Sequence, residues 1–307
     1  MHVVIAGGSG FVGQVLQEKL LSEESRVTIL TRNPENIRQT DRLRAVEWLK
    51  ENSHPEKEMG NVDAIVNLAG ESINGLRWTK QKKERILQSR MEATGEIIKL
   101  IDKLERKPQV LINASAVGYY GMSDTEVFTE KSPSDANDFL ADTVQKWERK
   151  ASEASRYGVR TVFARFGIIL GREGALPLMA LPYKVGIGGT IGTGRQWVSW
   201  IHVDDAAKMI KFAIDTHAIE GPLNVTAPTP VMMKEFGKVL GSVLRKPHWL
   251  PVPETALKVI LGEMSSMIIR GQRVLPEKAK VHHYEYLFPE LESALKDIFL
   301  KTKITSS

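Results

Sequence analysis

The sequence predicts an α/β protein in which a parallel sheet lies between two layers of helices. Two observations predict this class. Short apolar segments alternate with longer amphipathic segments over the first half of the chain, and the first apolar segment runs directly into a glycine-rich turn. Strands separated by helices of this length form right-handed crossovers, which build a parallel sheet. We therefore expect a Rossmann-like, doubly wound parallel sheet, joined to a smaller and mostly helical C-terminal lobe.

The first turn carries a nucleotide-binding pattern. Residues 3–6 form a short apolar run typical of a buried parallel strand, and helical spacing begins at Phe11. Between them, Gly7, Gly10 and Gly13 have the GxxGxxG spacing of a turn that binds a dinucleotide. The N-terminus of the following helix offers free N–H groups to the phosphates. The expected cofactor contacts in this stretch are Gly7, Gly10, Phe11, Val12 and Gly13.

The alternation continues as far as residue 166. The expected strands are residues 3–6, 26–30, a weaker run around Val46, 62–68, 109–114 and 160–166. The expected helices between them are residues 11–21, 78–104 and 139–157. Because the strands are short and apolar and the helices are amphipathic, this part of the chain is expected to form the sheet and its covering helices.

The composition changes from Gly171 onward. Residues 184–194 contain five glycines and prolines follow at short intervals, so this stretch cannot build a regular parallel sheet unaided. Residues 200–214 start extended and continue as a helix that Asp204 or Asp205 would cap. The remaining expected elements are a short strand at 223–226 and helices at 233–244, 254–270 and 291–300.

These segments predict two domains. A chain of 307 residues is long enough for one large domain with a smaller lobe. We expect a cofactor-binding domain of residues 1–170, to which the chain returns at about 200–226. Residues 171–199 and 227–307 are expected to form the smaller substrate lobe.

Composition and charge exclude several classes of protein. The chain has no Cys, which excludes disulfides, thiolate nucleophiles and Cys-ligated metals. Basic residues exceed acidic ones by 42 − 37 = 5, but they are scattered among acidic residues, so we expect no nucleic-acid partner. No apolar run reaches the roughly 18 residues that a membrane span needs, and we expect a cytoplasmic protein with no membrane contact. A single His202 without nearby ligands is expected to be structural, so we expect no metal site.

The end of the second strand bears on the choice between NAD and NADP. NAD-binding proteins place an acidic residue there, which holds the ribose and would repel a 2′-phosphate. Here the position is occupied by Thr31 and Arg32. Because a guanidinium matches a phosphate with paired hydrogen bonds, we expect NADP(H) to be preferred over NAD(H). The alternative is a surface turn in which both side chains are only solvated.

A second cofactor contact is expected where another buried strand ends. Asn67, Leu68, Ala69 and Gly70 close that strand at the carboxyl edge of the sheet, where parallel sheets bind ligands. Small residues there let the backbone lie against a cofactor, and the alternative is a turn that happens to be small. Glu71 follows directly and is a candidate acid, base or substrate contact, although the alternative is a solvated loop residue.

Longer motifs resemble the extended short-chain dehydrogenase/reductase superfamily, which includes the nucleotide-sugar epimerases. The motifs that carry this resemblance are GGSGFVG, VDAIVNLAG, NASAVGYYG, ARFGIILG and WIHVDD. The segments NLAGESI, RWTKQKKERILQSRMEAT and PVPETALKVILGEMSSMIIRGQRVLPEKA look like one part of that superfamily, the epimerase-family group. That group joins an atypical reductase fold to a short helical C-terminal domain.

The resemblance implies a bound dinucleotide and a small-molecule substrate. Position by position, it implies contacts with the dinucleotide from Gly7, Gly10, Gly13, Thr31, Arg32, Asn67, Ala69 and Gly70. Arg90 and Thr94 would lie beside it. Because helices of this superfamily often pair in dimers, a homodimer is compatible with the resemblance.

The catalytic pair of the superfamily is missing from this sequence. Working members use a Tyr-x-x-x-Lys pair on the helix after the fifth strand, where the phenol exchanges a proton with the substrate and the Lys lowers its pKa. Here that helix has the sequence DFLADTVQKWERKA, with Phe139 and Thr143, or Leu140 and Val144, at the expected positions. The position of the usual Ser or Thr falls on Ala116, one residue after a serine.

Ser115, Tyr119 and Tyr120 are the candidates to replace that pair. They come just after the strand at 109–114, at the edge where the nicotinamide is expected. Their hydroxyls would bind or exchange a proton with a substrate carbonyl. The alternative for each is packing, with a structural hydrogen bond from the hydroxyl.

Candidate substrate contacts follow the glycine-rich loop at 186–194. Superfamily members hold the distal part of a substrate in this region, which the resemblance assigns to Gln196 and Trp197. The backbone N–H groups of the loop would suit an anion. The alternative is a flexible connector between the two domains.

Two functions are consistent with these observations. The first is an NADP-dependent oxidoreductase or epimerase that acts on a carbonyl or hydroxyl of a small substrate, sugar-like or linked to a nucleotide. The second is a catalytically silent NADP-binding regulatory or interaction protein. The cofactor motifs and the substrate lobe favour the enzyme, and the missing Tyr-Lys pair favours the silent protein.

Overall fold

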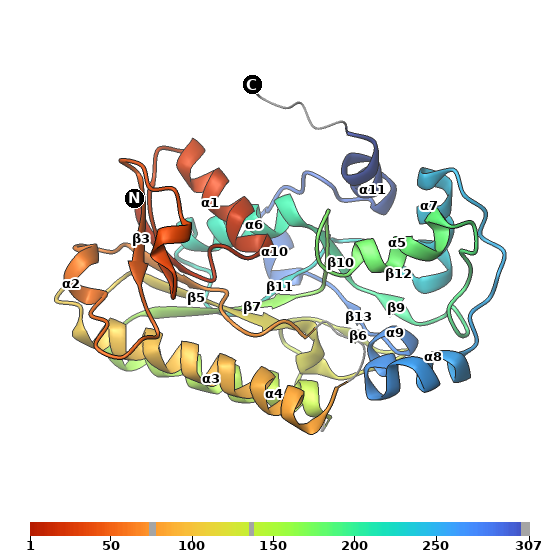
Figure 1. The fold of residues 1–307 in the computed structure, drawn as a ribbon, viewed down its shortest axis with the longest axis horizontal. Helices are drawn as coiled ribbons and strands as arrows, with labels where there is room; N and C mark the ends of the chain where they lie inside the picture. Colours follow the sequence, from red (N-terminus) through yellow and green to blue (C-terminus); the bar gives the residue numbers. More distant parts are fainter. Residues whose placement is uncertain (74–77, 135–137, 302–307) are drawn as a thin grey trace.

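A parallel sheet forms the centre of the structure. The computed structural model describes residues 1–73, 78–134 and 138–301, and in it seven strands pair in parallel in the order β11-β7-β5-β4-β1-β2-β3 (Figure 1). The sheet grows outward from β1 in both directions, through β4 on one side and β2 on the other. This confirms the predicted doubly wound sheet.

Helices cover both faces of this sheet. Its strands are β1 (His2–Ala6), β2 (Arg26–Thr31), β3 (Leu43–Glu47), β4 (Ala64–Asn67), β5 (Val110–Ala116), β7 (Arg160–Phe166) and β11 (Gly221–Val225). One face carries α1 (Phe11–Ser22), α6 (Val203–Asp215) and α10 (Glu277–Val281), and the other carries α3 (Lys80–Lys103) and α4 (Phe139–Ala151), while α2 (Glu56–Met59) lies at the β3 end (Figure 1).

The alternation of side chains along β1 explains why residues 3–6 of this strand are all apolar. Val3 and Ile5 pack into the core beneath α1 and α6, whereas Val4 and Ala6 pack into the core beneath α3. All four side chains are fully buried. A strand that is buried on both faces has no position where a polar residue would be solvated.

A lobe of short elements lies beyond the β11 and β7 side of the sheet. Its elements are β6 (Val127–Phe128), β8 (Ile168–Leu170), α5 (Leu176–Lys184), β9 (Trp197–Val198), β10 (Trp200–His202), β12 (Val231–Met232), α7 (Met233–Leu244), α8 (Glu254–Leu261), α9 (Ser266–Ile269), β13 (Arg273–Val274) and α11 (Leu291–Leu300). Three small two-stranded pairs, β8 with β10, β9 with β12 and β6 with β13, hold the loops together. The lobe has a separate apolar core, which includes Trp200, Phe236 and Leu295.

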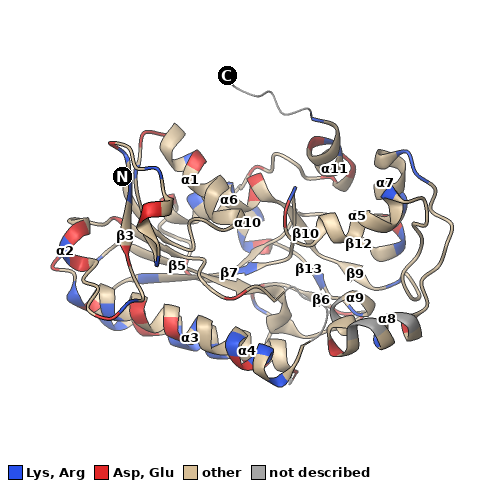
Figure 2. Cartoon of the chain, in the orientation of Figure 1, with Lys and Arg blue, Asp and Glu red and all other residues tan. Residues whose placement is uncertain are grey.

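Three predicted details of the secondary structure are wrong. The expected helix at 254–270 is broken into α8, a 3₁₀ turn and α9, because Gly262 takes a φ of 58° directly after α8. The expected helix at 139–157 is α-helical only to Ala151 and ends as a 3₁₀ turn. The cap of α6 is His202 rather than Asp204 or Asp205. No helix in the described part of the chain is both long and apolar enough to cross a membrane. Acidic and basic residues are interspersed along α3 (Figure 2).

Asp205 fastens the C-terminal part of the chain to α6. Its carboxylate is fully buried and accepts hydrogen bonds from the Tyr284 hydroxyl at 3.1 Å and from the backbone N–H groups of Leu287 and Phe288, both at 2.8 Å. Tyr284 packs, with Ala279, into the core between the sheet and α6. Part of the segment assigned to the lobe therefore covers the sheet, and the division into domains stays a prediction.

We expect Asp205→Asn to lower the free energy of unfolding by about 2 kcal/mol or more. The NH₂ group of the asparagine would face a backbone N–H that now donates to a carboxylate oxygen, and that buried N–H would lose its acceptor. Urea denaturation checks this. The matched control is Asp204→Asn, since the Asp204 side chain is 45% exposed. A change of less than about 0.5 kcal/mol is expected for that control. Equal losses in the two variants would contradict the role of Asp205.

Candidate functional site

The turn after β1 leaves no room for a side chain at Gly7 or at Gly13. A Cβ atom on Gly13 would lie 2.4 Å from the carbonyl oxygen of Gly7, and a Cβ atom on Gly7 would lie 2.8 Å from the carbonyl carbon of Leu68. The backbone of the turn therefore packs directly against its own helix on one side and against the end of β4 on the other. Only glycine permits these approaches, and Gly7 also has a φ of 79°.

The N-terminus of α1 is open to an anion. Gly10 is the N-cap and provides no side-chain hydrogen bond, so the first N–H groups of the helix lack a capping partner. Phe11 and Val12 form the first turn, and the Phe11 ring lies against Gly171, where an added Cβ would come within 2.3 Å of it. This contact places the N-terminus of α1 beside the segment that follows β8. The turn is the kind of cradle that the pyrophosphate of a dinucleotide requires.

Thr31 and Arg32 lie at the carboxyl end of β2. Thr31 is the last residue of the strand, and its hydroxyl accepts a hydrogen bond from Asn33 N at 3.2 Å. Arg32 is exposed and makes no hydrogen bond or ion pair with any described residue. Its guanidinium is therefore available to a phosphate group that reaches this edge of the sheet.

A buried amide network shapes the turn after β4. The Asn67 amide donates to Thr94 Oγ1 at 3.1 Å and to Asn113 Oδ1 at 2.7 Å, and its oxygen accepts from Ala69 N at 3.2 Å. The indole of Trp147 also donates to Thr94 Oγ1, at 2.8 Å. Because Asn67 and Thr94 are fully buried, they fix the turn from inside, and the backbone of the turn is the part that faces Gly7.

Arg90 holds the next stretch of this turn. Its Nη1 donates to the carbonyl oxygens of Glu71 at 3.0 Å and Ile86 at 2.9 Å, and its guanidinium lies 5.0 Å from the centre of the Trp147 ring. A Cβ atom on Gly70 would lie 3.2 Å from Arg90 Cγ, so Gly70 lets the two approach. Burial lowers the pKa of Arg90 to about 10, which leaves it charged at neutral pH.

Glu71 is already paired. Its carboxylate binds Lys82 Nζ at 2.7 Å and Arg85 Nε at 3.3 Å. The hydrogen bond from Lys82 lowers the pKa of Glu71, so the group is ionised at neutral pH. A paired carboxylate with a lowered pKa is a poor proton donor, and this geometry favours a structural role for Glu71.

A row of polar side chains crosses three neighbouring strands near their carboxyl ends. Ser115 on β5 is in register with Arg165 on β7, which is in register with Asn224 on β11, so the three side chains share one face of the sheet. From α4, Glu148 accepts a hydrogen bond from Ser115 Oγ at 2.5 Å. Arg165 binds the two oxygens of Glu148 through Nε and Nη2, each at 2.8 Å.

The two tyrosines meet the same arginine in different ways. The Tyr120 hydroxyl accepts from Arg165 Nη1 at 2.9 Å and donates to Asn224 Oδ1 at 2.7 Å. Burial raises the pKa of Tyr120 to about 12, so it stays protonated and is a poor base. The ring of Tyr119 stacks on Arg165, and the Cζ atom of Arg165 lies 3.4 Å from the centre of the ring. The Tyr119 hydroxyl has no partner in the described part of the chain.

Burial and pairing act on Arg165 in opposite directions. Burial lowers the pKa of the guanidinium, but the hydrogen bonds and charge of Glu148 outweigh it and raise the pKa above its ordinary value. The buried row is therefore built on the ion pair between Arg165 and Glu148. Glu148, Arg165 and Asn224 were missed as site residues from the sequence. A glutamate on the apolar face of α4 was the signal that could have found the first of them.

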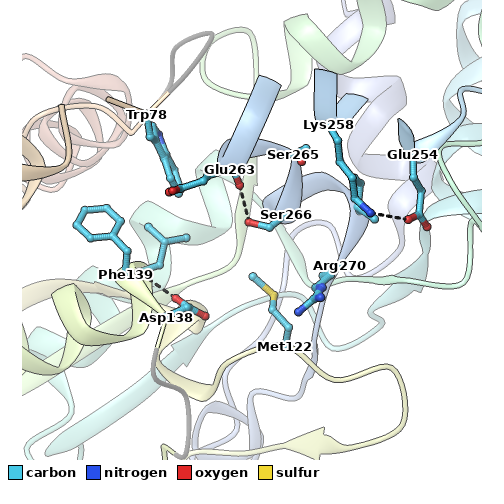
Figure 3. Close-up of a pocket in the computed structure, with 12 residues that line it drawn as sticks. Trp78, Met122, Asp138, Phe139, Glu254, Lys258, Glu263, Ser265, Ser266 and Arg270 are labelled. Carbon is cyan, nitrogen blue, oxygen red and sulfur yellow. Dashed lines mark hydrogen bonds and ion pairs between the residues drawn. The ribbon is translucent and has the colours of Figure 1, made fainter. Parts of the chain in front are cut away.

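A cavity of about 410 Å³ lies between the first turn of α4 and the segment from α8 to α9 (Figure 3). Its residues are Trp78, Met122, Asp138, Phe139, Leu140, Glu254, Lys258, Glu263, Ser265, Ser266, Ile269 and Arg270. Phe139 and Leu140 are the residues at the two expected positions of the catalytic tyrosine. The cavity therefore lies where the first turn of α4 would present a phenol, and it meets apolar side chains there instead.

Gln196 and Trp197 do not line this cavity. The Gln196 amide is buried and donates to the carbonyl oxygens of Ile191 at 3.1 Å and Ile268 at 3.0 Å. The Trp197 indole donates to Asp124 O at 3.2 Å, and Arg273 lies over its ring. Both side chains join loops of the lobe to one another.

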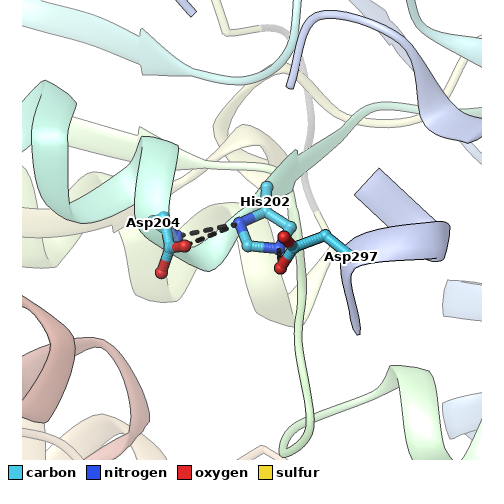
Figure 4. A group of neighbouring side chains, drawn as sticks. All are labelled: His202, Asp204 and Asp297. Atoms are coloured by element: carbon cyan, nitrogen blue, oxygen red, sulfur yellow. Dashed lines mark hydrogen bonds and ion pairs between the residues drawn. The ribbon is translucent and has the colours of Figure 1, made fainter. Parts of the chain in front are cut away.

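His202 has carboxylates on both sides (Figure 4). Its Nδ1 accepts the N–H of Asp204 at 3.1 Å and thereby caps α6, while Nε2 lies 3.6 Å from Asp297 Oδ2. The three side chains have the composition of a metal site, which the sequence did not indicate because Asp297 comes from α11. Since Nδ1 already accepts a backbone N–H, a neutral ring carries its proton on Nε2 and offers no lone pair there. This geometry favours the structural role.

Comparisons with known proteins agree with the fold. A family model described as the NAD dependent epimerase/dehydratase family matches residues 3–225, and a model described as a domain of unknown function (DUF1731) matches residues 252–298. The epimerase family protein YfhF of Bacillus subtilis (strain 168) is 50% identical over 303 residues, which cover 99% of each chain.

Solved structures agree as well. Human epimerase family protein SDR39U1 (isoform2), solved with NADPH, is 32% identical with a TM-score of 0.86, over 98% of this chain and 100% of that one. UDP-glucuronic acid 4-epimerase from Bacillus cereus, solved with UDP-glucuronic acid and NAD, has a TM-score of 0.77 over 97% of this chain and 98% of that one. At 16% identity, the second likeness is one of fold alone.

We expect Gly13→Ala to destabilise the protein by about 1–3 kcal/mol and to abolish dinucleotide binding, because the new methyl group would displace the Gly7 carbonyl. Urea denaturation and NADPH titration check both effects. Gly95→Ala in α3 is the control, since its Cβ would meet only Lys150 Cε at 3.6 Å. Tight NADPH binding by Gly13→Ala would contradict the role of the turn.

The burial of His202 predicts a pH dependence of stability. Burial lowers the pKa of His202 below 6.5, so the unfolded chain binds more protons and the free energy of unfolding falls as the pH drops below about 6.5. We expect His202→Asn to keep the cap of α6 but to show a shallower loss between pH 7 and 5, measured by urea denaturation. His217→Asn at an exposed position is the control, and equal slopes in wild type and His202→Asn would refute the expectation.

Proposed function

The chain belongs to the NAD dependent epimerase/dehydratase family, and on that premise we propose that it is an NADP(H)-dependent oxidoreductase or epimerase. Its substrate would be a small molecule with a carbonyl or hydroxyl group. The observation that carries the proposal is the juxtaposition of the glycine cradle after β1 with the Ser115–Glu148 pair on the same edge of the sheet. A cofactor cradle alone would not require a buried serine–glutamate pair at that edge.

The residues at the cradle fit a dinucleotide. Gly7 and Gly13 hold the backbone close enough for a pyrophosphate, and the uncapped start of α1 supplies N–H groups. The unpaired Arg32 supports a 2′-phosphate and hence NADP(H), as does the NADPH in the human SDR39U1 structure. When bound, the cofactor supplies or accepts the hydride.

The chain itself has to orient the substrate oxygen and move a proton. Ser115 Oγ donates a hydrogen bond to Glu148. Its lone pairs are therefore left to accept a proton from a substrate hydroxyl. That transfer would pass the serine proton to Glu148 Oε1, and the reverse sequence would protonate a carbonyl oxygen during reduction. Arg165 keeps the Glu148 carboxylate in place, and Tyr120 keeps Arg165 in place.

One observation favours the second candidate, a catalytically silent NADP-binding protein. Phe139 and Leu140 carry apolar side chains into the cavity at the two positions where a tyrosine is expected. In a silent protein, occupation of the cradle would order the neighbouring loops for a partner, and the Ser115–Glu148 pair would be only structural.

We expect Arg32→Ala to weaken NADPH binding by about 10- to 100-fold and to leave NADH binding unchanged, because only the phosphate contact is lost. Fluorescence titration with the two cofactors measures this. Arg156→Ala is the control, since Arg156 is exposed in the turn before β7, at the opposite edge of the sheet. NADH binding as tightly as NADPH to the wild type would refute the cofactor preference.

A turnover assay at 340 nm over a broad panel of carbonyl compounds tests the reaction. We expect NADPH consumption with at least one compound, and a loss of about 10²- to 10⁴-fold in kcat for Ser115→Ala with NADPH affinity retained. Tight NADPH binding without consumption anywhere in the panel would refute the enzyme and support the silent protein.

A further inference from the structure

We propose that the cavity of Figure 3 binds an organic carboxylate with an apolar, ring-bearing body, and that Arg270 binds the carboxylate. The inference rests on the proposed function, since it names the substrate class of the same site. Most polar groups around the cavity have partners within the protein, and the Arg270 guanidinium is left for a ligand.

One wall of the cavity is apolar and aromatic. Trp78 and Phe139 meet edge to face with their ring centres 5.8 Å apart, and the indole N–H of Trp78 is used by Ile73 O at 2.9 Å. Met122, Leu140 and Ile269 complete the apolar lining. This wall offers faces and methyl groups but no free donor, so it stabilises a flat or branched hydrocarbon body.

The carboxylates around the cavity have cationic or backbone partners. Glu263 forms an ion pair with Lys83 of α3, which ties the lobe to the sheet domain across the cavity. Asp138 caps α4 by accepting from Leu140 N at 2.8 Å and Ala141 N at 3.0 Å. Asp138 accepts both bonds through Oδ1 and Glu263 forms its ion pair through Oε2, so these carboxylates offer a ligand further acceptors but no donor.

The two serines of the cavity are also occupied as donors. The Ser265 hydroxyl donates a hydrogen bond to Gly262 O at 2.6 Å. The Ser266 hydroxyl donates a hydrogen bond to Glu263 O at 2.8 Å (Figure 3). Their oxygens can still accept hydrogen bonds, but a ligand gains no donor from either side chain.

Arg270 is the cation left for a ligand. Lys258 lies 3.6 Å from Glu254 on the same helix, whereas the Arg270 guanidinium makes no hydrogen bond or ion pair within the described residues. Figure 3 shows it beside Met122, among the residues that line the cavity. Arg270 is exposed and has no partner among the described residues, and a planar guanidinium binds a carboxylate through two parallel hydrogen bonds, so it favours a planar anion at one end of an apolar ligand.

The test is calorimetric titration of the full chain, with and without saturating NADP⁺, using four probes. They are 3-phenylpropanoate, its amide, acetate and 2-phenylethyl phosphate. Glucose is titrated separately as a neutral sugar. We expect 3-phenylpropanoate to bind at least about tenfold more tightly than each of the others. Arg270→Gln should weaken that binding by about 10- to 100-fold and Arg270→Lys by less, while Arg149→Gln, exposed on α4, should leave it unchanged.

Four results would overturn the proposal. They are equal binding of the amide, equal binding of acetate, tighter binding of glucose or the phosphate, and full affinity in Arg270→Gln. A thermal melt of Arg270→Gln checks its fold, and if that variant is unfolded, the comparison of carboxylate with amide in the wild type decides. A separate NADPH titration of the wild type keeps the two proposals distinct, because failure to bind NADPH refutes the proposed function whatever the cavity binds.

Discussion

The buried ion pair between Glu148 and Arg165 is the interaction on which the candidate site depends. It joins α4 to β7, and it also binds Ser115 through Glu148 and Tyr120 through Arg165. Two charges removed from water are tolerated only when their geometry is good and their other hydrogen bonds are made. Here Ser115 and Tyr120 supply two of these hydrogen bonds, so the cost of burying the charges is offset in part by the same contacts that position the polar row.

This arrangement separates the two tasks of the site. The cradle after β1 and the amide network around Asn67 are rigid backbone features, in which side chains act from inside to shape a turn. The polar row and the cavity, by contrast, need side chains from α4, from the sheet and from the lobe. The departures from the residues that the superfamily uses therefore lie in the second part, and the glycine turn keeps its usual form.

Much of the fold was predictable from the sequence, and the site only in part. Strands such as β1 and the turn at Gly13 depend on local periodicity and glycine spacing, which a sequence displays directly. Glu148, Arg165 and Asn224 come together through strand register and helix packing, which are properties of the assembled sheet. Arg270 follows α9, where the predicted continuous helix proved to be broken. Its place beside the cavity thus depends on tertiary structure.

The register of Asn224 with Arg165 also constrains the order in which the protein forms. β11 is made long after β7, with the whole of β8, α5, β9, β10 and α6 between them in the chain. Until β11 docks at the edge of the sheet, β7 is an edge strand with an unpaired backbone, and Tyr120 lacks the acceptor for its hydroxyl. Closing so long a loop is entropically costly and slow compared with helix formation. On the ribosome, the polar row is therefore among the last parts of the sheet domain to assemble, after most of the chain has been synthesised.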